Sequence, residues 1–406
     1  MNEREPKVER NFKLQMFMPA LFLANLSIYT TTYFQNIVLV DVAKTFKVSV
    51  GTMSQLATVS YLTGLIIGLV LGFLVVKFRH KSLLLLGITS YGVGILVYYF
   101  SPNFATVLFS PVFEGIGSGM VGTMIFTLIG EVLPLEKRGW AVGLVVSSQF
   151  FTNLIVAPVT SIIALDAGWR AVLLWFIFPV SMVSLLLGFL AIPSKPRQDL
   201  SVVKPEYLKA FQQILTNKSA VACIISAVLI GINSSLVVYA VTFFRMYFSV
   251  SLSTGAVFGL MASASGVLGG LVAARLINRT GRWLLALSTA LFAGFLHIFF
   301  TFVPCVYGSL AFWLVATFFV GVNAAGFTSL ILEQVPGFRG TMMSLNQSFR
   351  SLGLILGISV SGLLLNLYAS NFHIIMVMFG IAAVVAAAVL FLFAKDPTKN
   401  KLPPTA

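Results

Sequence analysis

The sequence predicts an all-α membrane protein with twelve transmembrane helices in two pseudo-symmetric six-helix bundles. Hydrophobic residues make up 58% of the 406 residues and charged residues only 9%, whereas a soluble domain carries about 25% charged residues. Apolar runs long enough to cross a hydrocarbon core of about 30 Å recur along the whole chain. The charged joint between two such runs occurs twice, at Gly130–Gly139 and at Leu332–Gly340.

The two joints indicate an internal duplication. Glu131 and Glu333 lie 202 positions apart, close to half the chain length, and the same offset relates the turn Lys77–His80 to the turn Arg279–Arg282. The stretch between the halves is rich in Lys and Pro and is predicted to contain a short amphipathic helix on the inner leaflet. We therefore expect an N-terminal bundle over residues 1–192, a cytoplasmic linker over 193–219, and a C-terminal bundle with a cytoplasmic tail over 220–406.

Each apolar run is predicted to be a helix, because backbone polar groups left without partners are too costly in lipid. The chain is therefore expected to cross the bilayer twelve times. The expected spans cover residues 14–40, 51–76, 82–101, 104–128, 140–164, 171–192, 220–246, 251–274, 283–303, 306–330, 341–366 and 372–394.

The net charge of +14 is explained by the loops rather than by a nucleic-acid-binding surface. Most of the 26 basic residues fall in segments on the same side as the N-terminus, and such an excess marks the cytoplasmic side of a membrane protein. We therefore expect a multi-pass protein of the cell membrane with both termini in the cytoplasm. No nucleic-acid partner is expected.

Neither a cofactor site nor an enzyme active site is expected. The run Gly117–Gly122 has the spacing of a dinucleotide-binding fingerprint, but that motif needs a preceding strand, and here it lies within a span. Cys223 and Cys305 make no disulfide framework. His297 has no second ligand at metal-binding spacing, so we interpret it as an interhelical hydrogen-bonding residue, and we expect His80 to be a solvated loop residue.

The first span carries more polar side chains than a lipid-facing helix should. Asn25, Tyr29, Thr32 and Asn36 recur at helical spacing and share one face, with Tyr33 beside them. Interhelical hydrogen bonds would explain single polar residues, but a stripe of this length favours the wall of an aqueous cavity. We predict that these five residues bind substrate.

Two charges are predicted to lie near the middle of the membrane, since Glu114 and Arg350 each fall about ten residues into a span. Charges at that depth are costly and usually functional, and the duplication repeats neither of them. A carboxyl group removed from water favours its neutral form, so Glu114 is expected to carry a coupling proton; a structural neutral acid is the alternative. Asn346 shares a face with Arg350, and together with Asn233 these residues are predicted to bind substrate.

The chain resembles the major facilitator superfamily. Twelve spans, a basic linker after the sixth span and duplicated inner loops are typical of that family. The loop Asn278–Arg282 is similar to the family's D-R-x-G-R loop with Asn in place of Asp, whereas Val76 stands at the Asp position in the first half. The joints at Glu131 and Glu333 and the run Gly168–Arg170 also fit the family's pattern.

Within the superfamily, the sequence is most similar to the twelve-span drug and metabolite:proton antiporter branch, which includes sugar-efflux-like permeases. It departs from that branch at Pro111, where members often carry Arg, and at Ala157–Pro158, the remnant of a Gly-rich run. The resemblance implies two bundles that rock about a central site lined by the first, fourth, seventh and tenth spans. It also implies a latch of inner-loop charges in the outward-facing state, and for this conformational latch we expect Lys77, Lys81, Glu131, Arg138, Arg279, Arg282, Glu333 and Arg339.

The first functional hypothesis is a monomeric, proton-coupled exporter of small, partly apolar organic molecules, in which Arg350 helps to bind substrate and Glu114 exchanges the proton. The second is an importer or facilitator in which Arg350 binds an organic anion and Glu114 balances its charge. A third, from another class, is a non-transporting membrane receptor or assembly factor. Neutralising Glu114 would have little effect on such a protein.

Overall fold

The computed structural model describes residues 7–48, 50–53, 55–193, 206–367 and 372–398. The regular elements in these residues are helices that follow the order expected from the apolar runs. The long ones are α1 (Lys7–Phe46), α3 (Gln55–Lys77), α4 (His80–Phe100), α6 (Ser110–Val132), α7 (Leu135–Ala167), α9 (Phe178–Ala191), α11 (Lys218–Ser234), α12 (Leu236–Tyr247), α13 (Leu252–Thr280), α14 (Arg282–Phe299), α15 (Val306–Leu332), α16 (Arg339–Leu367) and α17 (Phe372–Phe393).

Short elements connect or extend the long helices. The linker carries α10 (Glu206–Thr216), and a π-helical turn at Leu173–Ile177 joins α8 to α9. A break at Ser235 separates α11 from α12, which together make one span. The other short helices are α2 (Val50–Met53), α5 (Phe104–Val107), α8 (Trp169–Val172) and two 3₁₀ turns, at Phe300–Phe302 and Pro336–Phe338.

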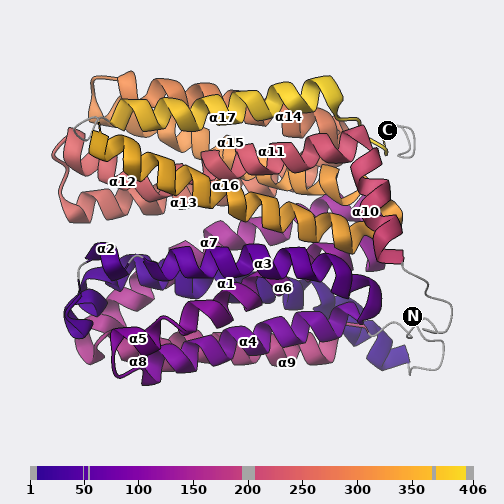
Figure 1. The fold of residues 1–406 in the computed structure, drawn as a ribbon, viewed down its shortest axis with the longest axis horizontal. Coiled ribbons are helices and arrows are strands. Elements are labelled where there is room, and N and C mark those ends of the chain that lie inside the picture. Colours follow the sequence, from indigo (N-terminus) through magenta and orange to yellow (C-terminus); the bar gives the residue numbers. More distant parts are fainter. Residues whose placement is uncertain (1–6, 49, 54, 194–205, 368–371, 399–406) are drawn as a thin grey trace.

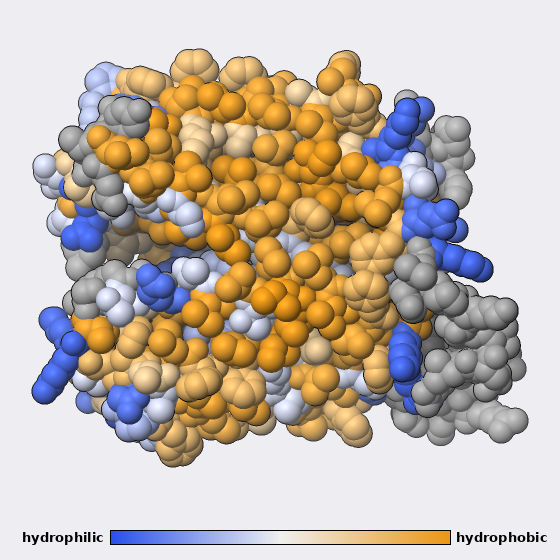
Figure 2. Space-filling view, in the orientation of Figure 1, coloured by the Kyte–Doolittle hydropathy of each residue, from blue (hydrophilic) through white to orange (hydrophobic). Residues whose placement is uncertain are grey.

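The helices have the length and composition of membrane spans. Eleven helical segments in the described residues meet both requirements, and α1 covers the expected first span with a more polar sequence. Figure 2 shows apolar side chains covering the middle of the molecule, with hydrophilic side chains gathered at its two ends. Large apolar side chains such as Trp175 and Phe391 are about two-thirds exposed (both 64%). A surface of this kind is suited to lipid rather than water.

The helices form two bundles that face each other (Figure 1). Helices α1 to α9 lie in one half of the picture and α11 to α17 in the other. The bundles meet mainly where α3 packs on α16 and where α7 packs on α13. Glycines permit this approach: a Cβ on Gly143 of α7 would lie 2.6 Å from the Cβ of Ala274 on α13. The expected pair of six-helix bundles is therefore the observed architecture.

The start of α1, the end of α17 and α10 lie at the same end of the molecule, here called the terminus side (Figure 1). In the described residues, most of the hydrogen bonds between the bundles lie in the half of the molecule toward this side. Thr341 donates to the carbonyl oxygen of Gly72 at 3.1 Å, and Asn278 donates to that of Glu136 at 2.5 Å. The contact farthest from the terminus side joins Asn153 to a serine of α13. The structure is thus closed on the terminus side.

Helix α10 lies across the end of the interface between α3 and α16. The ring of Phe211 stacks on that of Phe73, with 5.0 Å between centroids, and Ile214 is fully buried. Leu215 is 64% exposed, so apolar side chains of α10 point both inward and outward. Helix α10 thus occupies part of the predicted linker, and residues 194–205 of that linker lie outside the described residues.

Candidate functional site

Residues from both bundles face a common central space. Arg350 of α16 lies close enough for its charge to act on the hydroxyl groups of Tyr29 in α1 and Tyr61 in α3. Tyr29 and Arg350 are half-buried, as are Thr32 and Tyr33, and Asn36 is exposed. The structure thus brings Tyr29 of the predicted polar stripe close to Arg350 of the C-terminal bundle.

Asn25 departs from the stripe to which the sequence assigns it. Its side chain is buried and donates hydrogen bonds to the carbonyl oxygen of Val145 (3.0 Å) and to Ser148 Oγ (2.9 Å) on α7. Its amide is therefore committed to helix packing, and the interhelical hydrogen-bond interpretation applies to this position. Residues on one face of α1 thus have different surroundings. The turn that carries Asn25 packs on α7, whereas the turn that carries Tyr29 does not.

Glu114 lies inside the N-terminal bundle, where its side chain is 4% exposed. Gln35 of α1 donates from Nε2 to the two carboxyl oxygens at 3.2 and 3.4 Å. The hydroxyl of Ser110 lies beside the carboxyl group outside hydrogen-bond geometry, and Tyr91 and Tyr98 of α4 are close by. Within the described residues, no cation pairs with Glu114. A buried carboxyl group with an amide as its partner is suited to binding and releasing a proton.

Arg350 lies about 17 Å along α16 from the start of that helix at Arg339. Among the described residues it has neither an ion pair nor a side-chain hydrogen bond. It lines a small cavity that is open on one side and is otherwise enclosed by helices of the C-terminal bundle. The polar residues around this cavity are Asn233, Ser234, Asn323, Thr328, Asn346 and Arg350.

The cavity contains all three residues predicted for the second half of the substrate site, Asn233, Asn346 and Arg350. It also contains Asn323 of α15, which the sequence analysis missed although an asparagine stands out in such an apolar span. His297 lies behind the cavity, where Nδ2 of Asn233 contacts its Nδ1 at 2.9 Å. His297 is thus an interhelical hydrogen-bonding residue, in agreement with the interpretation from sequence.

Glu114 and Arg350 do not meet. Glu114 is enclosed by α1, α4 and α6 of the N-terminal bundle, whereas Arg350 lines the cavity of the C-terminal bundle. In the part of the chain that the structure describes, the two residues do not form an ion pair with each other. The two charges therefore act at separate places, so a role for Glu114 in balancing the charge of Arg350 would have to operate without contact.

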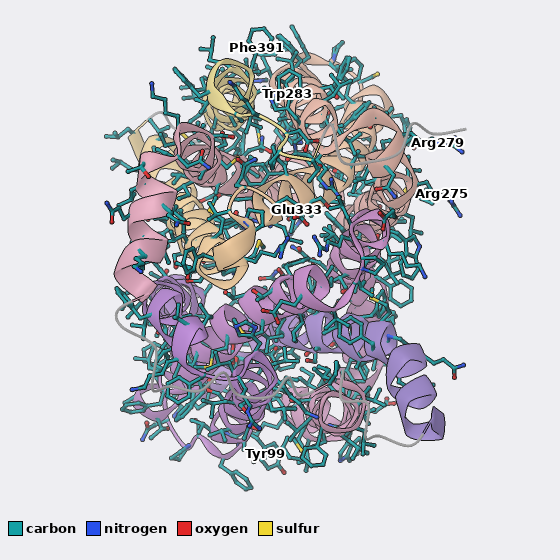
Figure 3. The ribbon with its side chains drawn as sticks, turned by 90° about the vertical axis from the view of Figure 1, so that its right-hand side faces the viewer. Tyr99, Arg275, Arg279, Trp283, Glu333 and Phe391 are labelled. Atoms are coloured by element: carbon teal, nitrogen blue, oxygen red, sulfur yellow. The ribbon has the colours of Figure 1, made fainter. Side chains whose placement is uncertain are left out.

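The predicted latch is centred on Glu333, at the end of α15. Its carboxylate pairs with Arg138 of the other bundle at 2.8 Å and with Arg339 at 2.9 Å, and its side chain is 3% exposed. Burial alone would raise the pKa of Glu333, but hydrogen bonds and charges from Arg339 and Arg138 outweigh it and lower the pKa. Viewed from the terminus side, Glu333 lies near the middle of the molecule (Figure 3).

The other predicted latch residues are dispersed. Glu131 pairs with Nδ1 of His80 at 3.1 Å, and Nζ of Lys81 donates to the carbonyl oxygen of Phe189 at 2.6 Å. His80 also lies 3.0 Å from the carbonyl oxygen of Val75. The expectation that His80 is a solvated loop residue is therefore wrong, because it begins α4 and is held between the ends of α3 and α6.

Arg279 and Lys77 do not join the centre of the latch, whereas Arg282 lies beside it. Its guanidinium donates to the carbonyl oxygen of Leu135 in the other bundle at 3.4 Å, and Glu333 and Arg138 are close enough for their charges to act on it. Arg282 is fully buried, its guanidinium donates to Thr398, and its backbone N–H donates to Asp396 at 3.1 Å. Asn278 stands where the family's loop has an aspartate, and here Asp396, in the segment after α17, supplies a carboxylate instead. Arg279 and Lys77 are exposed, and Figure 3 shows Arg279 at the edge of the terminus side. No group of three metal-ligating side chains occurs in the described residues.

Comparison with known proteins assigns the fold and the family. The model of the Major Facilitator Superfamily matches residues 21–357. The chain can be superposed on the proton:xylose symporter XylE with a TM-score of 0.78, covering 96% of this chain and 97% of that one at 15% identity. The human organic anion transporter MFSD10 (TETRAN) gives a TM-score of 0.74 at 14% identity, covering 95% and 100%.

Sequence relatives match over shorter stretches. The chain is 30% identical over 148 residues to the uncharacterized MFS-type transporter YcnB of Bacillus subtilis (strain 168), which is 36% of this chain and 31% of YcnB. It is 29% identical over 160 residues to the D-xylose transporter of Levilactobacillus brevis, covering 38% and 34%. With the lincomycin resistance protein LmrB of Listeria monocytogenes serovar 1/2a (strain ATCC BAA-679 / EGD-e) it shares 25% over 170 residues, covering 41% and 36%. The matches thus span about a third of each relative.

Proposed function

The chain belongs to the Major Facilitator Superfamily and is a multi-pass membrane transporter, not an enzyme, and we propose that it is a proton-coupled exporter of small organic molecules. In this proposal it acts as a monomer in the cell membrane by alternating access. Its terminus side faces the cytoplasm, because basic side chains such as Lys137, Arg275 and Arg279 are exposed there. The closed terminus side then makes the observed conformation the outward-facing state.

Glu114 is the observation that supports proton coupling. A carboxylate in the membrane interior without a cation is costly, and taking up a proton removes that cost. The partner of Glu114, Gln35, belongs to α1, which also carries Tyr29, Thr32 and Asn36 on the way to the central space. Protonation turns one carboxyl oxygen from an acceptor into a donor, so it changes the bond to Gln35. We infer that proton binding at Glu114 reaches the substrate site through α1.

The Glu333 latch supports alternating access. Arg138 and Glu333 come from opposite bundles, and their ion pair exists only while the terminus side is closed. A substrate that binds from the cytoplasm needs this pair to open, and release to the outside needs it to close again. An interaction of a few kcal/mol is enough to shift two conformations of similar free energy.

The test is proton movement driven by a compound. Purified protein is reconstituted into vesicles that hold a pH-sensitive dye, a pH gradient is imposed, and cationic, neutral and anionic compounds are added in turn. We expect one class to move protons in the direction opposite to its own transport. Glu114→Gln should abolish the proton movement, because the amide cannot titrate.

Glu136→Gln is the matched control, since it changes an exposed carboxylate on α7 in the same way. It should leave proton movement unchanged. Compound flux without proton movement in the unaltered protein would contradict the proposal and make Glu114 a structural neutral acid.

A second candidate function is import or facilitated passage of an organic anion, and the specific observation in its favour is Arg350, which has no counter-charge among the described residues. Arg350→Lys tests it, because a lysine keeps the charge and loses the two-pronged geometry that matches a carboxylate. Anion flux that falls at least about tenfold in this variant without any proton movement would favour the second candidate.

A further inference from the structure

The cavity of the C-terminal bundle contains an ordered set of polar groups whose orientation the proposed function leaves unexplained. Three asparagines and one arginine reach it from three helices: Asn233 from α11, Asn323 from α15, and Asn346 and Arg350 from α16. All three asparagines are at most 6% exposed. Buried amides are costly unless they have partners, so the orientation of each one indicates what the cavity would bind.

The amide of Asn233 presents its oxygen to the cavity. Its Nδ2 donates to the carbonyl oxygen of Phe379 at 2.9 Å and contacts Nδ1 of His297 at 2.9 Å. A backbone carbonyl can only accept, which fixes the nitrogen on that side, and both N–H groups are then in use. Within the described residues Oδ1 of Asn233 has no protein partner, yet it is not enclosed by protein atoms. It is an acceptor open to the cavity.

Asn323 is oriented in the same way on the neighbouring wall. Its Nδ2 donates to the carbonyl oxygen of Ala286 at 2.7 Å and to Oγ1 of Thr289 at 3.3 Å. Both of its N–H groups are again directed into the bundle, away from the cavity. Its Oδ1 has no partner among the described residues and is not enclosed. The cavity therefore has two fixed acceptors on two helices.

Helix α16 supplies donors. Arg350 has no side-chain partner in the described part of the chain, and a guanidinium can only donate. Asn346 lies one turn earlier on the same face of α16; its Oδ1 is buried without a partner, while its amide nitrogen is not enclosed. Helix α16 thus offers a positive charge with an amide donor beside it, and α11 and α15 offer two amide oxygens.

We propose that this cavity binds a hydroxylated carboxylate of the sugar-acid class, with its carboxylate on Arg350 and Asn346 and its hydroxyl groups donating to Asn233 and Asn323. The inference rests on the proposed transport function only in that substrate must reach the cavity; it holds for either direction and for either coupling. The enclosed part of the cavity is smaller than such a ligand, which would extend through the open side toward the central space. The Tyr29 hydroxyl of the other bundle is close enough to Arg350 to feel its charge.

Two simpler ligands each match half of the pattern. An alkyl carboxylate satisfies Arg350 but covers the oxygens of Asn233 and Asn323 with apolar atoms, which leaves two buried acceptors without partners. A neutral polyol satisfies the two oxygens but leaves the guanidinium without an anion. Sites built around hydrogen bonds discriminate strongly against ligands that lack the matching group, because the buried protein group is then unpaired.

The first experiment measures equilibrium binding by calorimetry on the purified full-length protein in detergent, with no pH gradient. D-gluconate, hexanoate and sorbitol are compared, since they share a six-carbon chain and differ in the carboxylate and the hydroxyl groups. We expect gluconate to bind at least about tenfold more tightly than either of the others. Equal binding of gluconate and hexanoate, or of gluconate and sorbitol, would overturn the proposal, and so would an absence of gluconate binding.

Variants assign the two halves of the pattern. Arg350→Gln should weaken gluconate binding at least about tenfold, whereas the same change at the exposed Arg245 on α12 should not. Asn233→Leu should reduce the ratio of gluconate to hexanoate affinity, because the leucine favours the alkyl chain. A ratio is informative even if the variant is less stable, since lost folding lowers both affinities together. An unchanged ratio would contradict the role of Asn233.

Failure of this inference and failure of the proposed function give different results. Gluconate binding in detergent together with vesicles that show no proton movement would leave the ligand assignment in place and remove proton coupling. Proton movement driven by compounds other than hydroxylated carboxylates, in a protein that does not bind gluconate, would support proton coupling and contradict the ligand assignment.

Discussion

Glu333 accepts from two arginines at the end of α15, whereas Glu131, its counterpart 202 positions earlier, pairs with His80. The Glu333 joint connects the two bundles through Arg138, and its carboxylate is 3% exposed. The pair of Glu131 with His80 lies within the N-terminal bundle, and the Glu131 side chain is 23% exposed. The duplication thus repeats the acidic residue and its place in the fold but not its partners.

This difference shows where closure of the terminus side is stabilised. A carboxylate that is almost fully buried and shared by two guanidinium groups is held by charge-assisted hydrogen bonds with little screening. A half-exposed carboxylate beside a histidine contributes far less. We infer that the second joint carries most of the electrostatic contribution to closure, and that the first joint mainly orders the end of its own bundle.

Among the variants that test this comparison, Glu333→Gln should have the largest effect on the stability of the closed conformation. The variant leaves two partly buried arginines without their anion, which we expect to destabilise the closed conformation by about 2–3 kcal/mol. The measurement is the distance between spin labels at Phe78 and Arg279, which are exposed positions on opposite bundles. The distance distribution should move from one short population to a longer one.

Glu131→Gln is the matched control for that experiment, because it makes the same change at the duplicated position. It should alter closure by less than about 1 kcal/mol and leave the short distance dominant. Equal shifts in the two variants would mean that the joints contribute equally, and the comparison would then fail.

The comparison extends to the helices that follow the joints. After the first joint, Gly143 of α7 faces Ala274, and an added Cβ would lie 2.8 Å from the backbone nitrogen and Cα of that residue. Backbone atoms cannot rotate away, so Gly143→Ala should destabilise the closed conformation by about 1–3 kcal/mol. The same labels report it. Gly362→Ala on α16 is the control, since nothing lies within 4 Å of its Cβ position.

The contact between α3 and α16 should tolerate an added methyl group better than the contact between α7 and α13. An added Cβ on Gly68 would collide with the Ser348 hydroxyl, whereas the nearest backbone atom, the carbonyl oxygen of Ser344, would be 3.3 Å away. A hydroxyl can turn to another rotamer at a cost of about 1 kcal/mol or less. Gly68→Ala should therefore open the terminus side less than Gly143→Ala, and the reverse order in the distance measurement would show that the α3–α16 interface is the stiffer one.

Hydropathy predicts this fold well because lipid requires a continuous helix wherever the chain crosses it. The twelve spans, the duplication and the helix in the linker follow from that requirement and from the charges that interrupt it. Glu114 and Arg350 stand out for the same reason, since a charge in an apolar run has few structural explanations. The cavity residues Asn233 and Asn346 could be selected by their polarity within spans.

Side-chain partners could not be predicted, since each depends on which helices touch. Asn25 is on the same helical face as Tyr29, but α7 covers only the first of them. Arg282 matches the family's loop, yet its carboxylate comes from Asp396, which no local pattern connects to it. Asn323 could have been noticed, although its role depends on Thr289 and Ala286 turning its oxygen to the cavity.

The smallest predicted effect concerns pH. Histidine ordinarily changes charge between pH 5 and 8, and only the protonated ring forms an ion pair with Glu131. The other charged side chains on the His80 turn are lysines and an arginine, types that do not ordinarily titrate in this range. The pair should therefore be stronger near pH 5.5 than near pH 8, with an effect below about 1 kcal/mol because both side chains are partly exposed.

His80→Arg keeps the charge at every pH, so we expect its thermal midpoint to equal that of the unaltered protein near pH 5.5 and to exceed it near pH 8. The Glu333 joint provides the contrast. Because its pKa is lowered in the folded protein, its stabilisation is complete above the ordinary carboxyl range and is lost only as the pH falls through the lowered pKa. The effect of Glu333→Gln should thus be the same at pH 5.5 and at pH 8. A constant difference between His80→Arg and the unaltered protein across this range would mean that the His80 pair is not governed by protonation, and the two joints would then differ in strength alone.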